Sequence, residues 1–154
     1  MPETAAVQKL IDHFHHDIPH ARELGMEVIS ASAERTEVRL PFRPEFLGDT
    51  ERQLIHPGVV TTLIDSTCGV GLMARLGRPV TIATLDLRVD YLRPSRPGIG
   101  LICSAECYRL TGQIAFMRAS VWQDDPATPV AASVSTFMLN SGGPQIGRPP
   151  EGAP

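Results

Sequence analysis

The chain has 154 residues, and its 14 basic and 17 acidic side chains give a formal net charge of −3 at pH 7. This length suits one domain with a single core. The weakly acidic charge excludes a protein that binds nucleic acid through a basic surface. Hydrophobic residues make up 42% of the chain without an apolar run of about 18 residues, so a globular protein with neither a membrane nor a nucleic-acid partner is expected.

The N-terminal segment lacks the basic and apolar regions of a secretory signal. The cysteines, Cys68, Cys103 and Cys107, match neither a disulfide framework nor a zinc motif. Free thiols are typical of a reducing compartment, so a cytoplasmic location is expected.

Hydrophobic periodicity predicts a helix, two strands, a loop, a long apolar helix and four further strands. The expected ranges are 3–16 (helix), 25–32 and 34–41 (strands), 43–58 (loop), 57–76 (helix), and 80–92, 99–110, 113–122 and 129–139 (strands). Pro57 suits the first helical turn because its missing N–H removes no helical hydrogen bond.

One long apolar helix among six strands predicts an α+β fold, with a curved antiparallel sheet wrapped around that helix. Residues 1–140 are expected to form a single domain, and the Gly- and Pro-rich segment 141–154 a disordered tail. Alternation along strand 80–92 places Leu85 on the apolar face and Thr84 on the polar face. A sheet with open edges favours oligomerisation.

Asp65 is the only acidic residue of helix 57–76 and lies in its apolar middle. Burying a carboxylate is costly unless it is paired or hydrogen-bonded. Asp65 is therefore either held by an arginine or hydroxyl group, or is catalytic. Its helical face carries mostly small and hydroxyl residues, which leave room for a ligand or a partner helix: Gly58, Thr61, Thr62, Asp65, Gly69 and Leu72. The residues expected to face the sheet are Val60, Leu63, Ile64, Met73 and Ala74.

The start of this helix offers free N–H groups and a positive dipole end to an anion or oxyanion. Gly58 and Asp65 are 65 − 58 = 7 residues apart, a rise of roughly 10.5 Å. That distance is too long for one helix to place both groups on a single carbonyl carbon. Two antiparallel helices would bring Asp65 of one copy near the helix start of the other, so a catalytic site would be shared across a dimer.

The segments IHPGVVTTLIDSTCGVG, TIATLDLRVDYLRPSRPG, AECYRLTGQIAFMRASVW and VAASVSTFML resemble hotdog-fold acyl-CoA thioesterases of the phenylacetate-pathway and 4-hydroxybenzoyl-CoA thioesterase group. The resemblance covers about residues 25–140. It implies a hotdog fold and hydrolysis of an acyl-CoA to free acid and CoA. It also implies a homodimer or homotetramer, and no metal or cofactor beyond the CoA of the substrate.

By position, the resemblance implies that Asp65 is the catalytic base or nucleophile and that His56 is the motif histidine. The oxyanion glycine of the family falls on Pro57, which has no N–H. The N–H of Gly58, or the next free amide of the helix, is therefore expected to polarise the thioester carbonyl.

Two further positions are implied by the same resemblance. The upstream amide of the family falls on Thr50, and the nearby Gln53 is a candidate to replace it. The active-site hydroxyl of some relatives matches Thr84.

The resemblance also implies contacts with the phosphates of CoA. Arg93 and Arg96 flank a turn near which the family binds CoA, and Arg88 and Arg109 are further candidates in the same expected cluster. Ordinary solvated arginines are the alternative for each.

Other readings of the sequence remain open. A non-catalytic acyl-CoA or small-ligand binding protein and a hotdog hydratase would share the fold. The N-terminal histidines His13, His15, His16 and His20 are expected to lie on a solvated face, with a metal site as the alternative.

Overall fold

The computed structural model describes residues 2–78 and 80–140. The helices are α1 (Pro2–Asp17), α2 (Pro19–Leu24), the 3₁₀ turn η1 (Pro44–Phe46) and α3 (Pro57–Leu76). The strands are β1 (Glu27–Ala31), β2 (Thr36–Leu40), β3 (Leu47–Asp49), β4 (Leu54–Ile55), β5 (Ile82–Tyr91), β6 (Leu101–Leu110), β7 (Ile114–Trp122) and β8 (Ala131–Leu139). The expected tail 141–154 lies outside the described residues.

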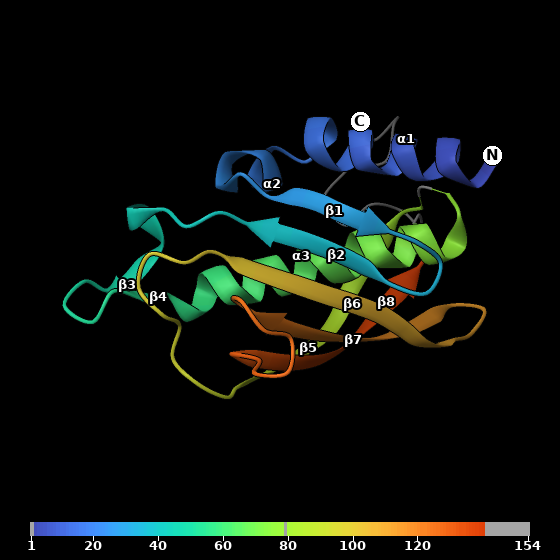
Figure 1. The fold of residues 1–154 in the computed structure, drawn as a ribbon. Helices are drawn as coiled ribbons and strands as arrows, with labels where there is room; N and C mark the ends of the chain where they lie inside the picture. Colours follow the sequence, from blue (N-terminus) through green and yellow to red (C-terminus); the bar gives the residue numbers. More distant parts are fainter. Residues whose placement is uncertain (1, 79, 141–154) are drawn as a thin grey trace, which may run out of the picture.

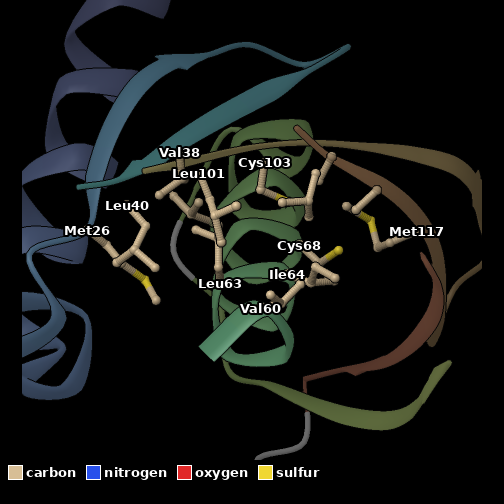
Figure 2. Packing of buried hydrophobic residues seen from close by; sticks show 14 of the residues in the cluster. Met26, Val38, Leu40, Val60, Leu63, Ile64, Cys68, Leu101, Cys103 and Met117 are labelled. Carbon is tan, nitrogen blue, oxygen red and sulfur yellow. The ribbon is translucent and has the colours of Figure 1, made fainter. Parts of the chain in front are cut away.

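Six strands form an antiparallel sheet in the order β1-β2-β6-β7-β8-β5. The sheet curves around α3, as Figure 1 shows from the side and Figure 2 along the helix. The predicted α+β fold, with one long central helix and a wrapped sheet, is confirmed. Because β1 and β5 each pair on one side only, they are the two edges of the sheet.

The core fills the space between α3 and the concave face of the sheet. Figure 2 shows Leu63, Ile64 and Cys68 of the helix pointing into side chains of the sheet. By composition alone α3 is long and apolar enough to cross a membrane, with a mean hydropathy of 1.3. Its burial against the sheet accounts for that composition.

The predicted bounds of α3 are confirmed, and local chemistry explains both ends. Pro57 occupies the first turn, and the His56 side chain caps the helix by accepting a hydrogen bond from the Gly58 N–H. Gly77 ends the helix in the left-handed conformation, with φ of 66°.

One detail of the predicted helix face is wrong. Leu72, expected on the open face, is fully buried, whereas Met73, expected to face the sheet, is half-buried and lies towards α1. Two positions one residue apart differ by about 100° around a helix, and α1 covers the side on which Met73 lies.

The segment expected as a loop, 43–58, contains η1 and the short β3–β4 pair. The turn between these strands is held by Asp49, whose Oδ1 accepts the N–H groups of Glu51 and Arg52 at 3.0 and 2.9 Å. Asx turns of this kind satisfy backbone donors locally. The β3–β4 pair leads the chain directly into the N-terminus of α3.

The expected alternation along β5 is interrupted by a bulge. The β5–β8 register shifts between Thr84 and Asp86, which pair with the adjacent residues Phe137 and Thr136. The extra residue, Leu85, is 51% exposed instead of lying on the core face. The bulge reverses the parity of the strand, so Thr84 faces α3 and the prediction that it lies on the polar face is wrong.

Candidate active site

Asp65 is half-buried in the middle of α3 and lies opposite β5. The Thr84 hydroxyl donates a hydrogen bond of 2.8 Å to its Oδ1. Within residues 2–78 and 80–140, Asp65 makes no ion pair, and its Oδ2 has no hydrogen-bond partner. Asp65 therefore keeps one carboxylate oxygen fixed and one available.

A cavity of about 280 Å³ opens beside this carboxylate. Its walls come from α1, α3, β5 and β8 and are mostly apolar, including Leu10, Phe14, Met73, Ile82 and Phe137. Asp65, Ser66 and Thr84 supply polar groups at its lining. An apolar pocket with a few convergent polar groups is typical of a small-molecule site.

The N-terminus of α3 borders a second cavity, of about 630 Å³. His56 and Pro57 line it together with Tyr91, Arg93 and Ser95 of β5 and the turn that follows. The residues lining this cavity are entirely different from those lining the cavity at Asp65. The two candidate halves of the site thus lie apart within one chain, as the helical rise predicts.

The helix start differs from the sequence prediction in its free donors. The Gly58 N–H, expected to face a substrate, donates at 2.8 Å to Nδ1 of His56. The Val59 N–H bonds the His56 carbonyl oxygen at 2.9 Å. With Pro57 lacking an N–H, no peptide donor is left free at positions 57–59 in this arrangement.

Sequence reasoning missed Tyr91, which fastens the helix start to β5. Its hydroxyl donates to the Pro57 carbonyl oxygen at 3.0 Å and lies 2.8 Å from Oγ1 of Thr61. The sequence feature that marks this residue is the segment YLRP, where Tyr91 ends the strand three residues before Pro94.

Comparison with known proteins identifies the family of this site. A family model described as the thioesterase superfamily matches residues 53–130, which are 130 − 52 = 78 of the 154 residues and include α3 and β5. The chain belongs to the thioesterase superfamily. This membership confirms the resemblance and the hotdog fold, and it makes the protein a thioester hydrolase.

Individual relatives agree with this membership. The thioesterase is 26% identical over 147 residues to the medium/long-chain acyl-CoA thioesterase YigI of Escherichia coli K12, covering 87% of this chain and 94% of YigI. A solved structure from Pseudomonas aeruginosa is 36% identical, with a TM-score of 0.77 and coverage of 86% and 98%. E. coli PaaI, from the phenylacetic acid degradation operon, shares the fold at 16% identity, with a TM-score of 0.76 and coverage of 88% and 94%.

The structure does not bring the predicted amide of this thioesterase to either cavity. Gln53 has a positive φ of 59° in the β3–β4 turn, and its Nε2 donates to the Thr50 carbonyl oxygen at 2.9 Å. Neither Gln53 nor Thr50 lines the cavity at the helix start. The Gln53 amide is therefore bonded within the β3–β4 turn and does not face a substrate.

The four candidate arginines do not form the cluster that the sequence predicts. Arg93 lines the helix-start cavity and an adjoining one of about 360 Å³, which Arg96 also lines. Arg96 additionally pairs with Asp124. Arg88 is exposed and pairs with Asp90 at 3.1 Å.

Arg109 lies at the other end of β6 from this turn. It is eight residues beyond the start of the strand at Leu101, roughly 27 Å along it. The prediction that Arg109 belongs to the cluster is therefore wrong, because most of the length of β6 separates it from the turn that carries Arg93 and Arg96.

The histidines of α1 have separate partners. His13 contacts Asp17 at 2.7 Å, His16 contacts the Asp12 carbonyl oxygen at 2.8 Å, and His15 accepts from the Val28 N–H at 3.3 Å. Among the described residues, no group of three or more His, Cys, Asp or Glu side chains is placed to hold a metal.

The cysteines of the thioesterase lie away from both cavities. Burial raises the pKa of the Cys68 thiol to about 12 and also raises that of Cys103. Cys107 is half-buried, and burial raises its pKa against the lowering effect of its bond to the Arg109 carbonyl oxygen. Thiols with raised pKa values are poor nucleophiles, so the candidate chemistry rests with Asp65.

Proposed function

We propose that this protein hydrolyses acyl-CoA thioesters, with Asp65 as the group that activates water. The observation that carries the proposal is the pairing of Asp65 with the Thr84 hydroxyl at 2.8 Å beside an apolar cavity. A carboxylate kept half-buried without a counter-ion at the mouth of a pocket is a candidate functional group. The acyl-CoA thioesterase YigI, a relative over most of the chain, supports the substrate class.

In the mechanism that fits this geometry, Asp65 acts as a general base. Thr84 holds Oδ1, and Oδ2 accepts a proton from the water that attacks the thioester carbonyl. The C–S bond then breaks, and the CoA thiolate takes the proton back from Asp65. An attack by Asp65 itself on the carbonyl is the competing mechanism.

The site is shared between two copies of the chain in this proposal. Within one chain, Asp65 and the start of α3 line different cavities. The face of α3 that carries Asp65 is only partly covered by the sheet. Strand β5 contacts it through Tyr91 and Thr84, but Gly58 is exposed and Thr61, Thr62 and Gly69 are half-buried. An antiparallel second α3 against this face would place the helix start of one copy near Asp65 of the other. Among the described residues no strand pairs with the adjacent edge of β5, which is therefore available to the same second copy.

The cavity beside Asp65 fits the acyl group. Its volume is about 280 Å³. Its apolar walls favour an unbranched acyl chain of medium length or an aromatic acyl group. The polar CoA portion then extends to the helix-start cavity, where Arg93 is placed to meet phosphate groups.

Steady-state hydrolysis of a panel of acyl-CoAs, followed by free-thiol detection, tests this proposal. The wild type is expected to turn over medium-chain or aromatic acyl-CoAs, and Asp65→Asn is expected to lose about 10³-fold in kcat. Asp86→Asn is the matched control, because Asp86 is an exposed carboxylate on the same strand as Thr84. The thermal unfolding midpoint of each variant shows whether the fold is kept.

Two results would contradict the proposal. Binding of acyl-CoA without turnover by the wild type would favour the non-catalytic ligand-binding alternative. Undiminished turnover by Asp65→Asn would remove Asp65 from the mechanism.

A further inference from the structure

The start of α3 poses a problem for any thioester hydrolysis at this site. The developing oxyanion needs a hydrogen-bond donor. The family resemblance implies such a donor at position 57, and Pro57 has no N–H. The next two donors, the N–H groups of Gly58 and Val59, are bonded to Nδ1 and the carbonyl oxygen of His56. The first turn of the helix therefore offers no free peptide donor.

The same hydrogen bond that uses the Gly58 N–H fixes the protonation of the His56 ring. A backbone N–H only donates, so Nδ1 must accept with its lone pair at 2.8 Å. In a neutral imidazole the proton then lies on Nε2. Within the part of the chain that the structure describes, Nε2 has no hydrogen-bond partner, so an N–H donor remains unused.

Two glycines leave the space that the His56 ring needs in this orientation. A Cβ at Gly58 would lie 2.9 Å from Nδ1, and a Cβ at Gly48 would lie 3.0 Å from Cδ2 of the same ring. Contacts this short would displace the imidazole. The backbone N–H of His56 also bonds the Phe46 carbonyl oxygen at 2.8 Å, so η1, β3 and α3 together fix the residue at the lining of the 630 Å³ cavity.

We propose that Nε2–H of His56 is the oxyanion donor of this enzyme, in place of the peptide N–H that Pro57 lacks. This inference rests on the thioesterase function proposed above. A side-chain donor adjacent to residue 57 can reach the same carbonyl oxygen that a residue-57 N–H would reach. Tyr91 is the neighbouring candidate donor, but its hydroxyl already donates a hydrogen bond to the Pro57 carbonyl oxygen at 3.0 Å.

His56 keeps its proton throughout the proposed reaction. Water forms the new C–O bond as its proton passes to Asp65, and the carbonyl π electrons move to the oxygen, which accepts the Nε2–H hydrogen bond. When the oxyanion re-forms the carbonyl, the C–S bond breaks and its electron pair leaves on the CoA sulfur. The Asp65 proton then neutralises the thiolate.

The variant His56→Asn separates the donor from the cap. Asparagine is a good N-cap residue, so its side chain keeps the acceptor for the Gly58 N–H but is too short to reach where Nε2 lies. The expected result is a loss of about 10²- to 10³-fold in kcat, with little change in KM and an unchanged unfolding midpoint.

A second substitution tests rescue. Pro57→Gly introduces a peptide N–H at the first position of α3, so adding it to His56→Asn is expected to restore at least tenfold in kcat, about 1.4 kcal/mol. A merely structural role of His56 predicts no rescue, since Pro57→Gly only loosens the helix start.

The outcomes separate the two proposals. Absence of turnover by the wild type would overturn the proposed function itself. An active wild type with an equally active His56→Asn variant would overturn only the role of His56. A damaged His56→Asn variant that Pro57→Gly does not rescue would also overturn it.

Discussion

Thr84 on β5 and Asp65 on α3 are joined by a hydrogen bond of 2.8 Å that depends on a β-bulge. Without the register shift after Thr84, this hydroxyl would point away from the helix. The bulge thus converts a residue of an alternating strand into the partner of the candidate catalytic carboxylate. Bulges beside active sites commonly re-aim a side chain in this way.

Removal of the Thr84 hydroxyl tests that relationship. Thr84→Val keeps the shape of the side chain but leaves Oδ1 of Asp65 without its donor. A hydrogen bond to a charged group contributes about 1.5–3 kcal/mol to stability, so the unfolding midpoint is expected to fall by several degrees. We expect kcat to fall at least tenfold, because Asp65 is no longer held in position. Thr84→Ser, which keeps the hydroxyl, is the matched control. Equal kcat for Thr84→Val and the wild type would remove Thr84 from the mechanism.

The acyl cavity predicts a change of chain-length preference in Met73→Ala. Met73 is half-buried on α3 and lines the cavity at Asp65. Truncation opens space for roughly three heavy atoms, and each buried methylene contributes about 0.8 kcal/mol. The acyl-CoA with the highest kcat/KM is therefore expected to lengthen by two or three carbons.

Met138→Ala is the control for this substitution, because Met138 is 40% exposed and does not line the cavity. It is expected to leave the kcat/KM profile across chain lengths unchanged. An unaltered profile for Met73→Ala would place the acyl group elsewhere.

Arg93 is expected to contribute to CoA binding and not to chemistry. It lines the helix-start cavity and the adjoining one. Because the side chain is exposed, its loss in Arg93→Ala is worth about 1 kcal/mol, a rise of roughly fivefold in KM for acyl-CoA at low salt. KM for an acyl-N-acetylcysteamine thioester, which has no phosphates, should not change. Arg109→Ala serves as the control, since Arg109 lies at the far end of β6; an equal rise in KM for that variant would contradict the assignment.

The buried thiols predict how stability depends on alkaline pH. Burial raises the pKa of Cys68 to about 12 in the folded protein, whereas an unfolded thiol has a pKa of about 8.5. Between these values only the unfolded chain loses the proton, so the free energy of unfolding falls as pH rises, by about 1.4 kcal/mol per pH unit for each such thiol.

Urea unfolding at pH 8 to 10.5 measures this dependence. The slope for Cys68→Ala is expected to be shallower than that of the wild type, while Cys103 still contributes. In the native protein, a thiol reagent at pH 8 should modify the half-buried Cys107 before the two buried cysteines. Identical slopes for wild type and Cys68→Ala would contradict the burial of this thiol.

Much of the fold follows from sequence patterns that act locally. The ends of α3 were predictable because Pro57 and Gly77 are chemical signals for a helix start and stop. The strands 82–91, 101–110, 114–122 and 131–139 were predictable to within two residues because each alternates or is bounded by turn residues.

Parts of the site were not predictable because they depend on non-local geometry. The position of Thr84 depends on a bulge that strand periodicity does not reveal. The occupation of the Gly58 N–H depends on the rotamer of His56, and the place of Arg109 depends on which end of β6 meets the helix start. Residue types in the sequence identified the candidate site residues, whereas the tertiary structure determines which of them lie close together.

The central claim is that one thioester carbonyl is held between Asp65 of one copy and the α3 start of a second copy. A crystal structure with an acyl-CoA analogue, in which CH₂ replaces the thioester sulfur, measures this directly. The analogue carbonyl oxygen is expected within about 3 Å of the His56 ring of one copy, with Asp65 of the other copy one water molecule from the carbonyl carbon. An analogue held by a single chain, or with its acyl group outside the cavity at Asp65, would contradict it.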